Sequence, residues 1–510
     1  MPTSINLASL LWDRATADGD SEFVLDDSAS TSWSYRQLAD AAAALAAQLR
    51  PGVTGVMLPN GAPMLVTAFA AWMRGNQVAL LNSALSPHER DRAIVEAGIT
   101  QLVTAKALAT GDAQVADAEV LLAEDVPLFE PGVAASGTPN VAEAPQGTDA
   151  VLIFTSGTTG SAKAARLTHE RLIQAAESMA QSLKGRPGPY PVAAPEVPPN
   201  LVAGPLAQTG GVNTLVFALV VGRRLLIIDR FSPARVLDLA RKHRLDTFVG
   251  TPTMLQMLAT FDGDSTWPSL RKVISGGAPL TAAVQERFER RFGVHITQVY
   301  GQTETGYIAG YSTDDVAAGL RRPGSVGRPY PGVEIVIKDP AGRPVPARTS
   351  GEVVVRTPFS MKGYAAAGAD GSNQGADAEG WFETGDLGYL DEDGYLYLVG
   401  RSKELILCGG FNVYPAEIEQ ALLSHDSVLE AAAFGIPDER LGEVPVAAVE
   451  ARTGTSTEEL TSYVRTRLAH YKAPREIRIV DELPRTESNK ILKRALRDDW
   501  LRSEQAGCPQ

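Results

Sequence analysis

The strongest chemical signal in the chain is Ile153-Phe154-Thr155-Ser156-Gly157-Thr158-Thr159-Gly160-Ser161-Ala162-Lys163. An apolar strand pattern runs into a loop of Gly, Ser and Thr, and the loop ends at a lysine. Glycines let backbone N–H groups approach phosphate oxygens, hydroxyls add donors, and a lysine adds positive charge. Two residues separate Gly160 from Lys163, so this is not a Walker A loop, which needs Gly-Lys-Ser/Thr. The pattern predicts a phosphate-binding loop, and a flexible surface loop is the alternative.

Strand and helix patterns alternate on both sides of this loop. Before it, Val53–Leu58 and Gln77–Leu81 read as strands, Ala62–Arg74 reads as a helix, and Ser86-Pro87 reads as the start of another helix. After it, the same alternation returns at 224–228 (strand), 232–243 (helix), 247–249 (strand) and 273–275 (strand). This order predicts an α/β fold with parallel sheets and crossover helices.

The pattern of expected secondary structure changes in the last third of the chain. From Gly324 onward, short strands at 334–338, 351–356 and 395–399 are separated by Pro, Gly and Asp turns, which indicates a smaller β-rich unit. After Gly400-Arg401 a compact α+β segment is expected, with a helix from Pro415, strands near 429–434 and 444–449, and a helix after Ser456.

Composition excludes several classes of protein. The 510 residues are 44% hydrophobic and 21% charged, which is ordinary for a globular chain. The net charge of −13 argues against a nucleic-acid partner or an anionic membrane surface. Two cysteines, Cys408 and Cys508, provide neither a disulfide framework nor a zinc site, and the longest apolar stretches are too short to span a bilayer. We therefore expect a cytoplasmic protein without a transmembrane segment.

Four further motifs follow the glycine-rich loop in a fixed order. They are Tyr300-Gly301-Gln302-Thr303-Glu304-Thr305-Gly306, Trp381-Phe382-Glu383-Thr384-Gly385-Asp386, Gly400-Arg401-Ser402-Lys403-Glu404 and Pro484-Arg485-Thr486-Glu487-Ser488-Asn489-Lys490. Together the five motifs resemble the adenylate-forming superfamily, which includes acyl-CoA synthetases, firefly-type luciferases and the adenylation domains of peptide synthetases. The resemblance covers nearly the whole chain.

The resemblance implies a large N-terminal domain, residues 1–400, built from two sheet-and-helix subdomains and a distorted β-barrel. It also implies a small mobile α+β domain, residues 401–510, with a hinge near Lys403. Two half-reactions are implied: a carboxylate attacks the α-phosphate of ATP to give acyl-AMP and pyrophosphate, and the thiol of CoA then displaces AMP. The co-substrates are ATP and CoA, and Mg²⁺ is the metal.

The resemblance assigns roles to residues of the first half-reaction, in which positioning and electrostatic stabilisation supply most of the catalysis. The β- and γ-phosphates would be bound by Thr155, Ser156, Gly157, Thr158, Thr159, Gly160 and Lys163. Thr303 would reach the α-phosphate, and Glu304 would bind Mg²⁺, which prefers oxygen ligands. The adenosine would be held by Gly276, Gly277, Ala278, Pro279, Tyr300, Gly301, Asp386 and Arg401, with Tyr300 stacked on adenine and Asp386 on the ribose hydroxyls.

The C-terminal motif supplies the adenylation lysine of the family, which corresponds to Lys490. The residue before it is Asn489 where the family usually has Gly, and Asn is the non-glycine residue best able to take a left-handed conformation. Rotation at Lys403 would carry Lys490 away and bring Gly409 and Gly410 toward the site, where glycines let a pantetheine arm approach the backbone. Cys408 lacks an adjacent histidine and is expected to be a passive small residue.

The acyl pocket is expected around Ala207, Gln208, Gly211, Gly277 and Gly306. Ala207 and Gln208 replace the Phe and His that acyl- and aryl-CoA ligases often carry there, which indicates room for a bulky, mostly apolar acid. The alternative is that neighbouring side chains fill the space. The absence of an Asp in this segment argues against an amino-acid substrate, because a buried ammonium group needs a partner.

Three functional classes remain open on the sequence alone. The first is a complete acyl-CoA ligase. The second is an adenylating enzyme whose thiolation is delegated to a partner or directed to a carrier-protein thiol, which the departures at Gln208, Asn489, Ala162 and Ala164 keep open. The third is a catalytically silent binding protein, which the retention of the charged motif residues disfavours.

Overall fold

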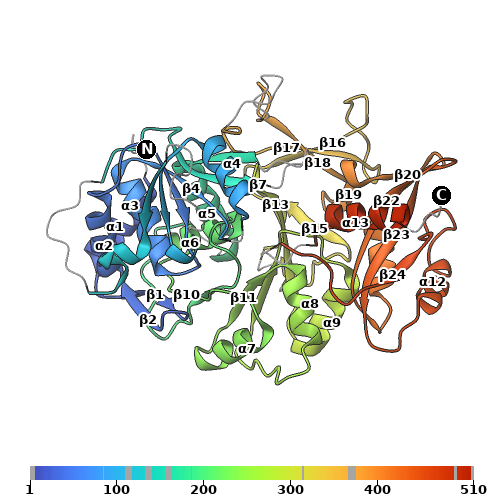
Figure 1. Ribbon diagram of the computed structural model, residues 1–510, viewed down its shortest axis with the longest axis horizontal. Coiled ribbons are helices and arrows are strands. Elements are labelled where there is room, and N and C mark those ends of the chain that lie inside the picture. The colour runs from blue at the N-terminus through green and yellow to red at the C-terminus, as the bar shows by residue number, and fades with distance from the viewer. Residues whose placement is uncertain are drawn as a thin grey trace.

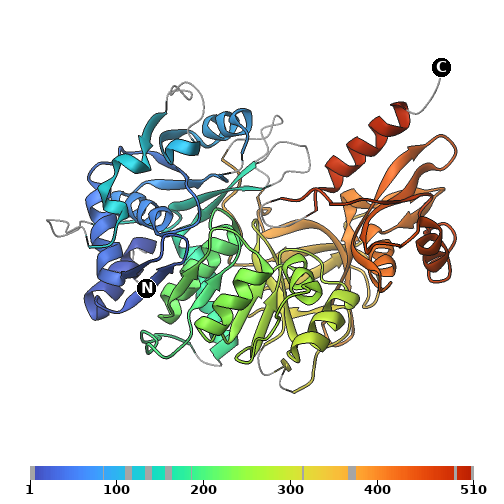
Figure 2. The same cartoon turned by 60° about the horizontal axis from the view of Figure 1, so that its bottom comes forward.

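The computed structural model describes residues 6–83, 85–108, 118–132, 141–155, 163–184, 187–312, 315–316, 318–365, 375–486 and 491–506. The chain runs from a helix-rich N-terminal part, through a central sheet, to a small C-terminal part (Figure 1). Figure 2 shows that the C-terminal part, coloured orange to red, stands beside the rest of the molecule. No helix within the described ranges is long and apolar enough to cross a membrane.

The first layer is a six-stranded sheet with the order β6 (Glu119–Leu122), β5 (Ile99–Thr104), β3 (Val53–Met57), β4 (Gln77–Leu80), β7 (Asp149–Thr155) and β8 (Lys163–Thr168). Its neighbouring strands are parallel except for β7 and β8, which are antiparallel. The crossover helices are α3 (Ala62–Arg74) and α4 (Pro87–Ala97). The predicted bounds of α3 are confirmed, as is the N-cap of α4 at Ser86, whose side chain accepts a hydrogen bond from Glu89 N.

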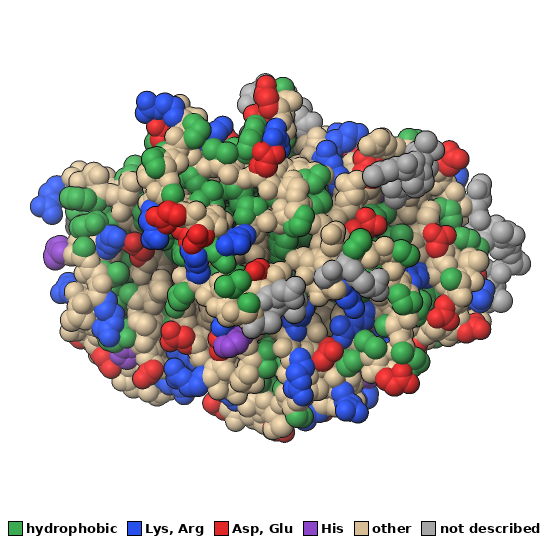
Figure 3. Space-filling view, turned by 180° about the vertical axis from the view of Figure 1, so that it is seen from behind, with side chains coloured by type: hydrophobic (Ala, Val, Ile, Leu, Met, Phe, Trp, Pro, Cys, Tyr) green, Lys and Arg blue, Asp and Glu red, His purple; other side chains and the backbone are tan. Residues whose placement is uncertain are grey.

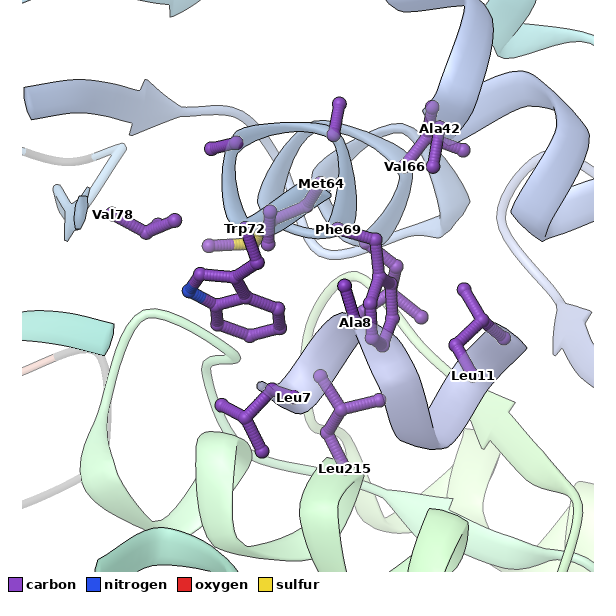
Figure 4. Close-up of a cluster of buried hydrophobic side chains, with 14 of the residues drawn as sticks. Leu7, Ala8, Leu11, Ala42, Met64, Val66, Phe69, Trp72, Val78 and Leu215 are labelled. Carbon is purple, nitrogen blue, oxygen red and sulfur yellow. The ribbon is translucent and has the colours of Figure 1, made fainter. Parts of the chain in front are cut away.

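The core beside this sheet is formed by helices. α1 (Leu7–Asp18), α2 (Tyr35–Ala46) and α3 pack together, and α6 (Thr209–Val221) adds Leu215 to the same cluster (Figure 4). Trp72 lies at the centre of the cluster, and its ring N–H donates to the carbonyl of Ala150 in β7 at 2.9 Å. The helical layer is thereby fixed to the strand that leads into the glycine-rich loop.

A four-stranded sheet joins the N-terminal residues to the middle of the chain, with the order β2 (Thr31–Ser34), β1 (Glu22–Asp26), β10 (Leu225–Ile227) and β9 (Asn200–Val202). β1, β10 and β9 are parallel, and β2 is antiparallel to β1. The next helices are α5 (His169–Lys184), which contacts α6, β7 and β8, and α7 (Pro233–Lys242), α8 (Pro252–Thr260) and α9 (Ala282–Phe292), of which α8 contacts both α7 and α9.

The largest sheet has nine strands, in the order β11 (Thr247–Gly250), β12 (Lys272–Ser275), β13 (Ile296–Gln302), β14 (Gly306–Gly310), β15 (Ser325–Pro329), β19 (Leu396–Arg401), β18 (Trp381–Leu390), β17 (Gly351–Arg356) and β16 (Glu334–Lys338). The first three strands are parallel, and the pairings beyond β13 are antiparallel. The β-rich unit expected after Gly324 is present. It is continuous with the parallel strands through β14 and β15, which local sequence patterns do not predict.

The C-terminal part has its own sheet, in which β21 (Phe411–Val413), β20 (Ile406–Cys408), β23 (Gly442–Ala451) and β22 (Val428–Asp438) are neighbours and β24 (Ile477–Ile479) pairs with β23. Its helices are α11 (Pro415–Leu423), α12 (Thr457–Arg465) and α13 (Lys493–Ala506). Gln256 of α8 donates to the carbonyl of Leu429 at 2.5 Å, which links this part to the large sheet. The short helical turn Ser402–Glu404 lies between β19 and β20.

Candidate active site

A cavity of about 1660 Å³ lies where the three regions of the chain meet. Its lining comes from the ends of β7 and β8, from α6, from β11, β12 and β13, from residues 381–385 and 401–403, and from Thr486. In the space-filling view, hydrophobic side chains gather toward the middle of the molecule, and acidic and basic side chains are interspersed around them (Figure 3). Among the described residues, this cavity brings most of the predicted site residues together.

The glycine-rich loop is flanked by two residues that line the cavity. Thr155 ends β7 and Lys163 begins β8, and the two face each other as a cross-strand pair. The Thr155 hydroxyl donates to the carbonyl of Lys163 at 3.4 Å. Ser156, Gly157, Thr158, Thr159 and Gly160, which were predicted to bind phosphate, lie outside the described residues.

Thr303 and Glu304 follow β13 and also line the cavity. The Thr303 and Thr209 hydroxyl oxygens are 2.6 Å apart. Glu304 Oε1 accepts a hydrogen bond from the Tyr364 hydroxyl at 3.0 Å, and Lys163 Nζ lies 5.2 Å from the centre of the Tyr364 ring. Tyr364 therefore contacts both the predicted metal ligand and the predicted phosphate lysine.

Sequence reasoning did not identify Tyr364. The segment around it runs along β8, where Tyr364 and Ala165 form an isolated bridge and Arg166 N donates to the carbonyl of Gly363 at 2.9 Å. The Met361 N–H also donates to the Glu304 carbonyl. This pairing between residues almost 200 positions apart has no local sequence signal, so only the fold could place Tyr364 in the site. Burial and the adjacent Glu304 carboxylate raise the pKa of Tyr364, which keeps its hydroxyl protonated and able to donate.

The oxygen donors here suit a magnesium ion bound together with ATP. Glu304 supplies one carboxylate, and the hydroxyls of Thr155 and Thr303 also line the cavity. No group of three or more His, Cys, Asp or Glu side chains that could hold a metal occurs in the described part of the chain. Mg²⁺ is commonly held by one or two carboxylates plus substrate phosphates and water, and this donor set fits that pattern.

Asp386 is the centre of a second polar group. Its Oδ1 accepts from Arg401 Nε at 2.8 Å, and its Oδ2 accepts from the Tyr300 hydroxyl and from Gln302 Nε2, both at 2.7 Å. Asp386 and Arg401 are cross-strand partners of β18 and β19, which explains why the two distant motifs meet. Gln302 was missed as a site residue, although it lies within the Tyr300–Gly306 motif.

The position of Tyr300 differs from the expected one, because its side chain was predicted to stack on adenine in the site. The residues of β13 that line the cavity are Val299, Gly301 and Gln302, whereas Tyr300 and Asp386 are buried at 8% and 6% exposure and are not among the lining residues. Burial, followed by the charge of Asp386, raises the pKa of Tyr300 well above its ordinary value. The Tyr300 hydroxyl therefore stays protonated as a donor to Asp386. The predicted stacking on adenine stays a prediction.

The predicted adenine segment lies at the end of β12. Gly276, Gly277 and Ala278 line the cavity, whereas Pro279 does not. Gly277 has φ +82, a left-handed conformation that favours glycine. A Cβ on Gly301 would lie 2.3 Å from the carbonyl oxygen of Gly306, so this strand pair requires a glycine there.

The predicted acyl residues Ala207, Gln208, Gly211, Gly277 and Gly306 all line the same cavity. Two of the glycines also have a packing reason. A Cβ on Gly211 would lie 2.4 Å from the Pro205 carbonyl oxygen, and a Cβ on Gly306 would lie 2.8 Å from Phe359 Cβ. The apolar part of the lining near them includes Met179, Val202, Phe217, Met254, Ile274 and Tyr307.

Only some of the predicted site segments of the C-terminal part line the cavity. Thr486 lines the cavity. The preceding Arg485 forms an ion pair with Glu450, with 3.0 Å between Arg485 Nη2 and Glu450 Oε1. Lys403 also lines the cavity, but Gly409 and Gly410 are exposed and are not among the lining residues. Lys490, the predicted adenylation lysine, and Asn489 lie outside the described residues.

Two further residues with reactive side chains, a cysteine and a histidine, are buried away from the cavity lining. Cys408 is buried, and burial followed by the nearby Asp438 raises the pKa of its thiol, which disfavours the thiolate. His169 is buried, and its Nδ1 accepts the Leu7 N–H at 3.1 Å.

Comparison with known proteins identifies the family of the chain. The family of AMP-binding enzymes matches residues 11–365, and the C-terminal domain of AMP-binding enzymes matches residues 417–490. A 2-succinylbenzoate–CoA ligase of Bacillus velezensis is 33% identical over 91% of this chain and 92% of its own length. A feruloyl-CoA synthase of an Amycolatopsis species is 34% identical over 92% of this chain and 94% of its own.

Solved structures of related enzymes have the same fold. The o-succinylbenzoate CoA synthetase of Bacillus subtilis, in complex with an acyl-adenylate intermediate, superimposes with a TM-score of 0.82 at 30% identity, over 96% of this chain and 98% of that one. The ATP-bound MatB of Rhodopseudomonas palustris gives a TM-score of 0.86 at 28% identity, over 98% and 99% of the two chains. By its sequence and by its fold, this chain belongs to the family of AMP-binding enzymes.

Proposed function

We propose that the chain is an AMP-forming acid–thiol ligase of the acyl-CoA synthetase type. In the first step, a carboxylate oxygen of the acid bonds to the α-phosphorus of ATP and pyrophosphate leaves. In the second step, the sulfur of CoA bonds to the acyl carbon and AMP leaves. The observation that carries the proposal is one cavity that holds Thr155, Lys163, Thr303 and Glu304 beside an apolar end.

The polar side of the cavity fits the adenylation step. Thr155 and Lys163, with Ser156–Gly160 between them, hold the β- and γ-phosphates, and Thr303 contacts the α-phosphate. Glu304 holds Mg²⁺, which neutralises phosphate charge when bound. Gly276, Gly277, Ala278, Pro279, Tyr300 and Gly301 form the adenine site. Asp386 and Arg401 hold the ribose; three donors use three of the roughly four acceptor positions of the Asp386 carboxylate, which leaves one at Oδ1.

The division into domains is part of the proposal. Residues 1–400 form the nucleotide and acyl domain, residues 401–510 form the mobile domain, and Lys403 is the hinge. Thr486 lines the cavity while Gly409 and Gly410 lie outside its lining, which supports an arrangement ready for adenylation, the step that we assign to Lys490. Rotation at Lys403 would exchange the two segments for thioester formation.

The acid is bulky and mostly apolar. The apolar lining next to Ala207 and Gln208 supports this, as do the relatives named for 2-succinylbenzoate and ferulate, both of which contain a ring. Because those relatives are named for CoA, we propose CoA as the acceptor and not a carrier-protein thiol.

A panel of ring-bearing and aliphatic acids tests the proposal when pyrophosphate and CoA thioester are measured in the same reactions. We expect both products with ATP, Mg²⁺ and CoA, and neither without ATP. Lys490→Ala should abolish pyrophosphate release but still convert preformed acyl-AMP to thioester, because its charge is needed only for adenylation. Pyrophosphate without thioester would instead identify an enzyme that uses another acceptor, and no pyrophosphate with any acid would contradict the proposal.

A further inference from the structure

Two carboxylates of the C-terminal sheet, Glu430 and Glu450, lie directly opposite each other. They are cross-strand partners in the antiparallel pair of β22 and β23, so their side chains leave the sheet on the same face. Both are largely shielded from water, with side-chain exposures of 11% for Glu430 and 19% for Glu450. Like charges placed opposite each other destabilise a strand pair, and burial adds to the cost. The two carboxylates therefore require a compensating positive charge.

Arg485 supplies this charge. Its Nη2 lies 3.0 Å from Glu450 Oε1, and its Nη1 lies 3.5 Å from Glu430 Oε2. Burial raises the pKa of the Glu430 carboxyl to about 7, and the charge of Arg485 is the largest of the effects that lower it. One guanidinium thus connects both carboxylates, and we call Glu430, Glu450 and Arg485 the ion triad.

The backbone of Arg485 is paired with the part of the chain that follows the proposed adenylation lysine. Arg485 and Ile491 form an isolated antiparallel bridge, and the Leu492 N–H donates to the Pro484 carbonyl at 2.8 Å. We call this pairing the junction. Thr486, the residue after Arg485, lines the cavity. The two ends of the segment that contains the lysine are therefore joined next to the cavity.

Side chains attach the junction to the sheet beneath it. Leu483 is fully buried, and its N–H donates at 2.7 Å to Glu450 Oε1, the same oxygen that pairs with Arg485. Ile491 packs against the apolar cluster that Leu483 forms with alanines of β22 and β23. Apolar contacts are non-directional, so they hold the junction against the sheet without setting its direction. Charge-assisted hydrogen bonds have a defined geometry, and the ion triad supplies them.

We propose that Arg485 is a positioning residue for adenylation, and that Glu430 and Glu450 hold it in place. The direction in which the chain leaves Arg485 then sets how the segment that contains Lys490 enters the cavity. Arg485 is not among the residues that line the cavity, so it acts through Lys490. This inference rests on the proposed function, because it assumes that Lys490 serves the first half-reaction. The alternative is that the ion triad only stabilises the C-terminal sheet.

Separate measurement of the two half-reactions tests the inference. Arg485→Gln should lower kcat for pyrophosphate release roughly 10- to 100-fold, because a small displacement of a charged group from the reacting phosphate has an effect of this size. The KM for ATP and the rate of thioester formation from preformed acyl-AMP should stay close to those of the parent. Arg485→Lys keeps a positive charge between the carboxylates and should recover part of the rate. Arg502 forms an exposed ion pair with Asp499 in α13 at 3.3 Å, so Arg502→Gln is the matched control and should keep the parent rates.

A second variant covers a failure of Arg485→Gln to fold, which would lower both half-reactions. Glu450→Gln keeps the shape of the side chain and leaves Glu430 beside Arg485. It should also slow pyrophosphate release selectively. In the folded protein the double variant should be no slower than Arg485→Gln alone, because the two residues act through one contact. Equal slowing of both half-reactions in Glu450→Gln, or parent-like pyrophosphate release in either single variant, overturns the inference.

Hydrogen exchange separates this inference from the proposed function, because it needs no turnover. The Leu492 amide is hydrogen-bonded across the junction, so its exchange reports whether the junction opens. Arg485→Gln should accelerate this exchange, and Arg502→Gln should not. Equal exchange at Leu492 in Arg485→Gln and the parent overturns the inference, because the ion triad then does not hold the junction. If no acid releases pyrophosphate from the parent, the proposed function fails, and the exchange still decides whether the ion triad holds the junction.

Discussion

At the scale of single residues, the proposed nucleotide site contains two acidic groups that are held in different ways. Asp386 is buried and accepts three side-chain hydrogen bonds, from Arg401, Tyr300 and Gln302. Glu304 lines the cavity and accepts one from Tyr364. Asp386 is therefore fixed before a ligand arrives, whereas Glu304 keeps most of its lone pairs for a cation.

Asp386→Ala should weaken ATP and AMP to a similar extent, because the ribose is common to both. The loss of a charge-assisted hydrogen-bond pair is expected to cost about 1.5–3 kcal/mol of binding free energy. Isothermal titration with each nucleotide measures it. Tyr300→Phe is the control, since it removes one donor to Asp386 and keeps the carboxylate. Unchanged affinity for both nucleotides in Asp386→Ala would mean that Asp386 only stabilises the β18–β19 pair.

Tyr364→Phe should raise the Mg²⁺ concentration needed for half-maximal pyrophosphate release. The hydroxyl that positions Glu304 is lost, while the ring near Lys163 stays. A hydrogen bond to a charged group contributes ~1.5–3 kcal/mol, so the shift should be roughly tenfold or more. Tyr364→Leu also removes the ring and should lower the affinity for ATP further. A parent-like Mg²⁺ dependence in Tyr364→Phe would exclude a positioning role for the hydroxyl.

At the scale of elements, the site is assembled by strand pairs that join distant parts of the chain. β7 and β8 hold Thr155 opposite Lys163, β18 and β19 hold Asp386 opposite Arg401, and residues 362–365 run along β8. The elements themselves are largely predictable, because apolar periodicity, a Ser N-cap and a Pro at the first turn are local signals. The pairing between them is not, because it depends on contacts between residues far apart in the sequence. The contacts of Tyr364 with Glu304 and of Gln302 with Asp386 were missed for this reason.

One helix junction has a consequence for stability against pH. His169 begins α5 and accepts the first N–H of α1, from Leu7, at 3.1 Å. Burial lowers the pKa of His169 to about 4 from an ordinary value of 6.5. The folded state therefore keeps the imidazole neutral at a pH where the unfolded chain binds a proton. Its contribution to stability is complete above pH ~6.5, falls as the pH drops toward ~4, and is lost below that.

The parent should lose on the order of 3 kcal/mol of unfolding free energy through this group between pH 6.5 and 4. His169→Gln should be less stable than the parent at pH 7 and should show a shallower decline toward acid pH. Thermal or urea unfolding at several pH values measures both effects. His88 is exposed, so His88→Gln should keep the slope of the parent. Equal slopes in the parent and His169→Gln would show that other groups set the acid sensitivity.

At the scale of the whole molecule, the proposed mechanism requires two segments of the C-terminal part at one cavity at different times. Thr486, four residues before Lys490, lies at the cavity, while Gly409 and Gly410 are exposed outside its lining. The described contacts between the C-terminal part and the rest include hydrogen bonds from Gln256 to the Leu429 carbonyl, from Arg287 to the Val428 carbonyl at 3.5 Å and from the Ser402 hydroxyl to the Gly385 carbonyl at 3.2 Å, and α11 packs against α9. Within the C-terminal part, Lys493 pairs with Glu404 at 2.9 Å and Glu419 at 2.8 Å, which ties α13 to the turn at Lys403. The C-terminal part can therefore move as a unit when that turn changes its backbone torsions.

Lys403→Pro should slow thioester formation more than adenylation. Proline fixes φ near −65° and removes an N–H, so the turn Ser402–Glu404 would lose the torsional freedom that rotation needs. Adenylation should change less, because Thr486 already lines the cavity in this structure and no rotation is then needed for this step. Lys403→Ala is the matched control: it removes the same side chain but keeps the N–H and the backbone freedom, so it should retain both rates if the hinge acts through its backbone.

Stopped-flow measurement of pyrophosphate release, and of thioester formation from preformed acyl-AMP, separates the two steps. Equal slowing of both steps in Lys403→Pro would indicate general damage to the fold. Parent-like rates for both would show that rotation about this residue is not part of the mechanism.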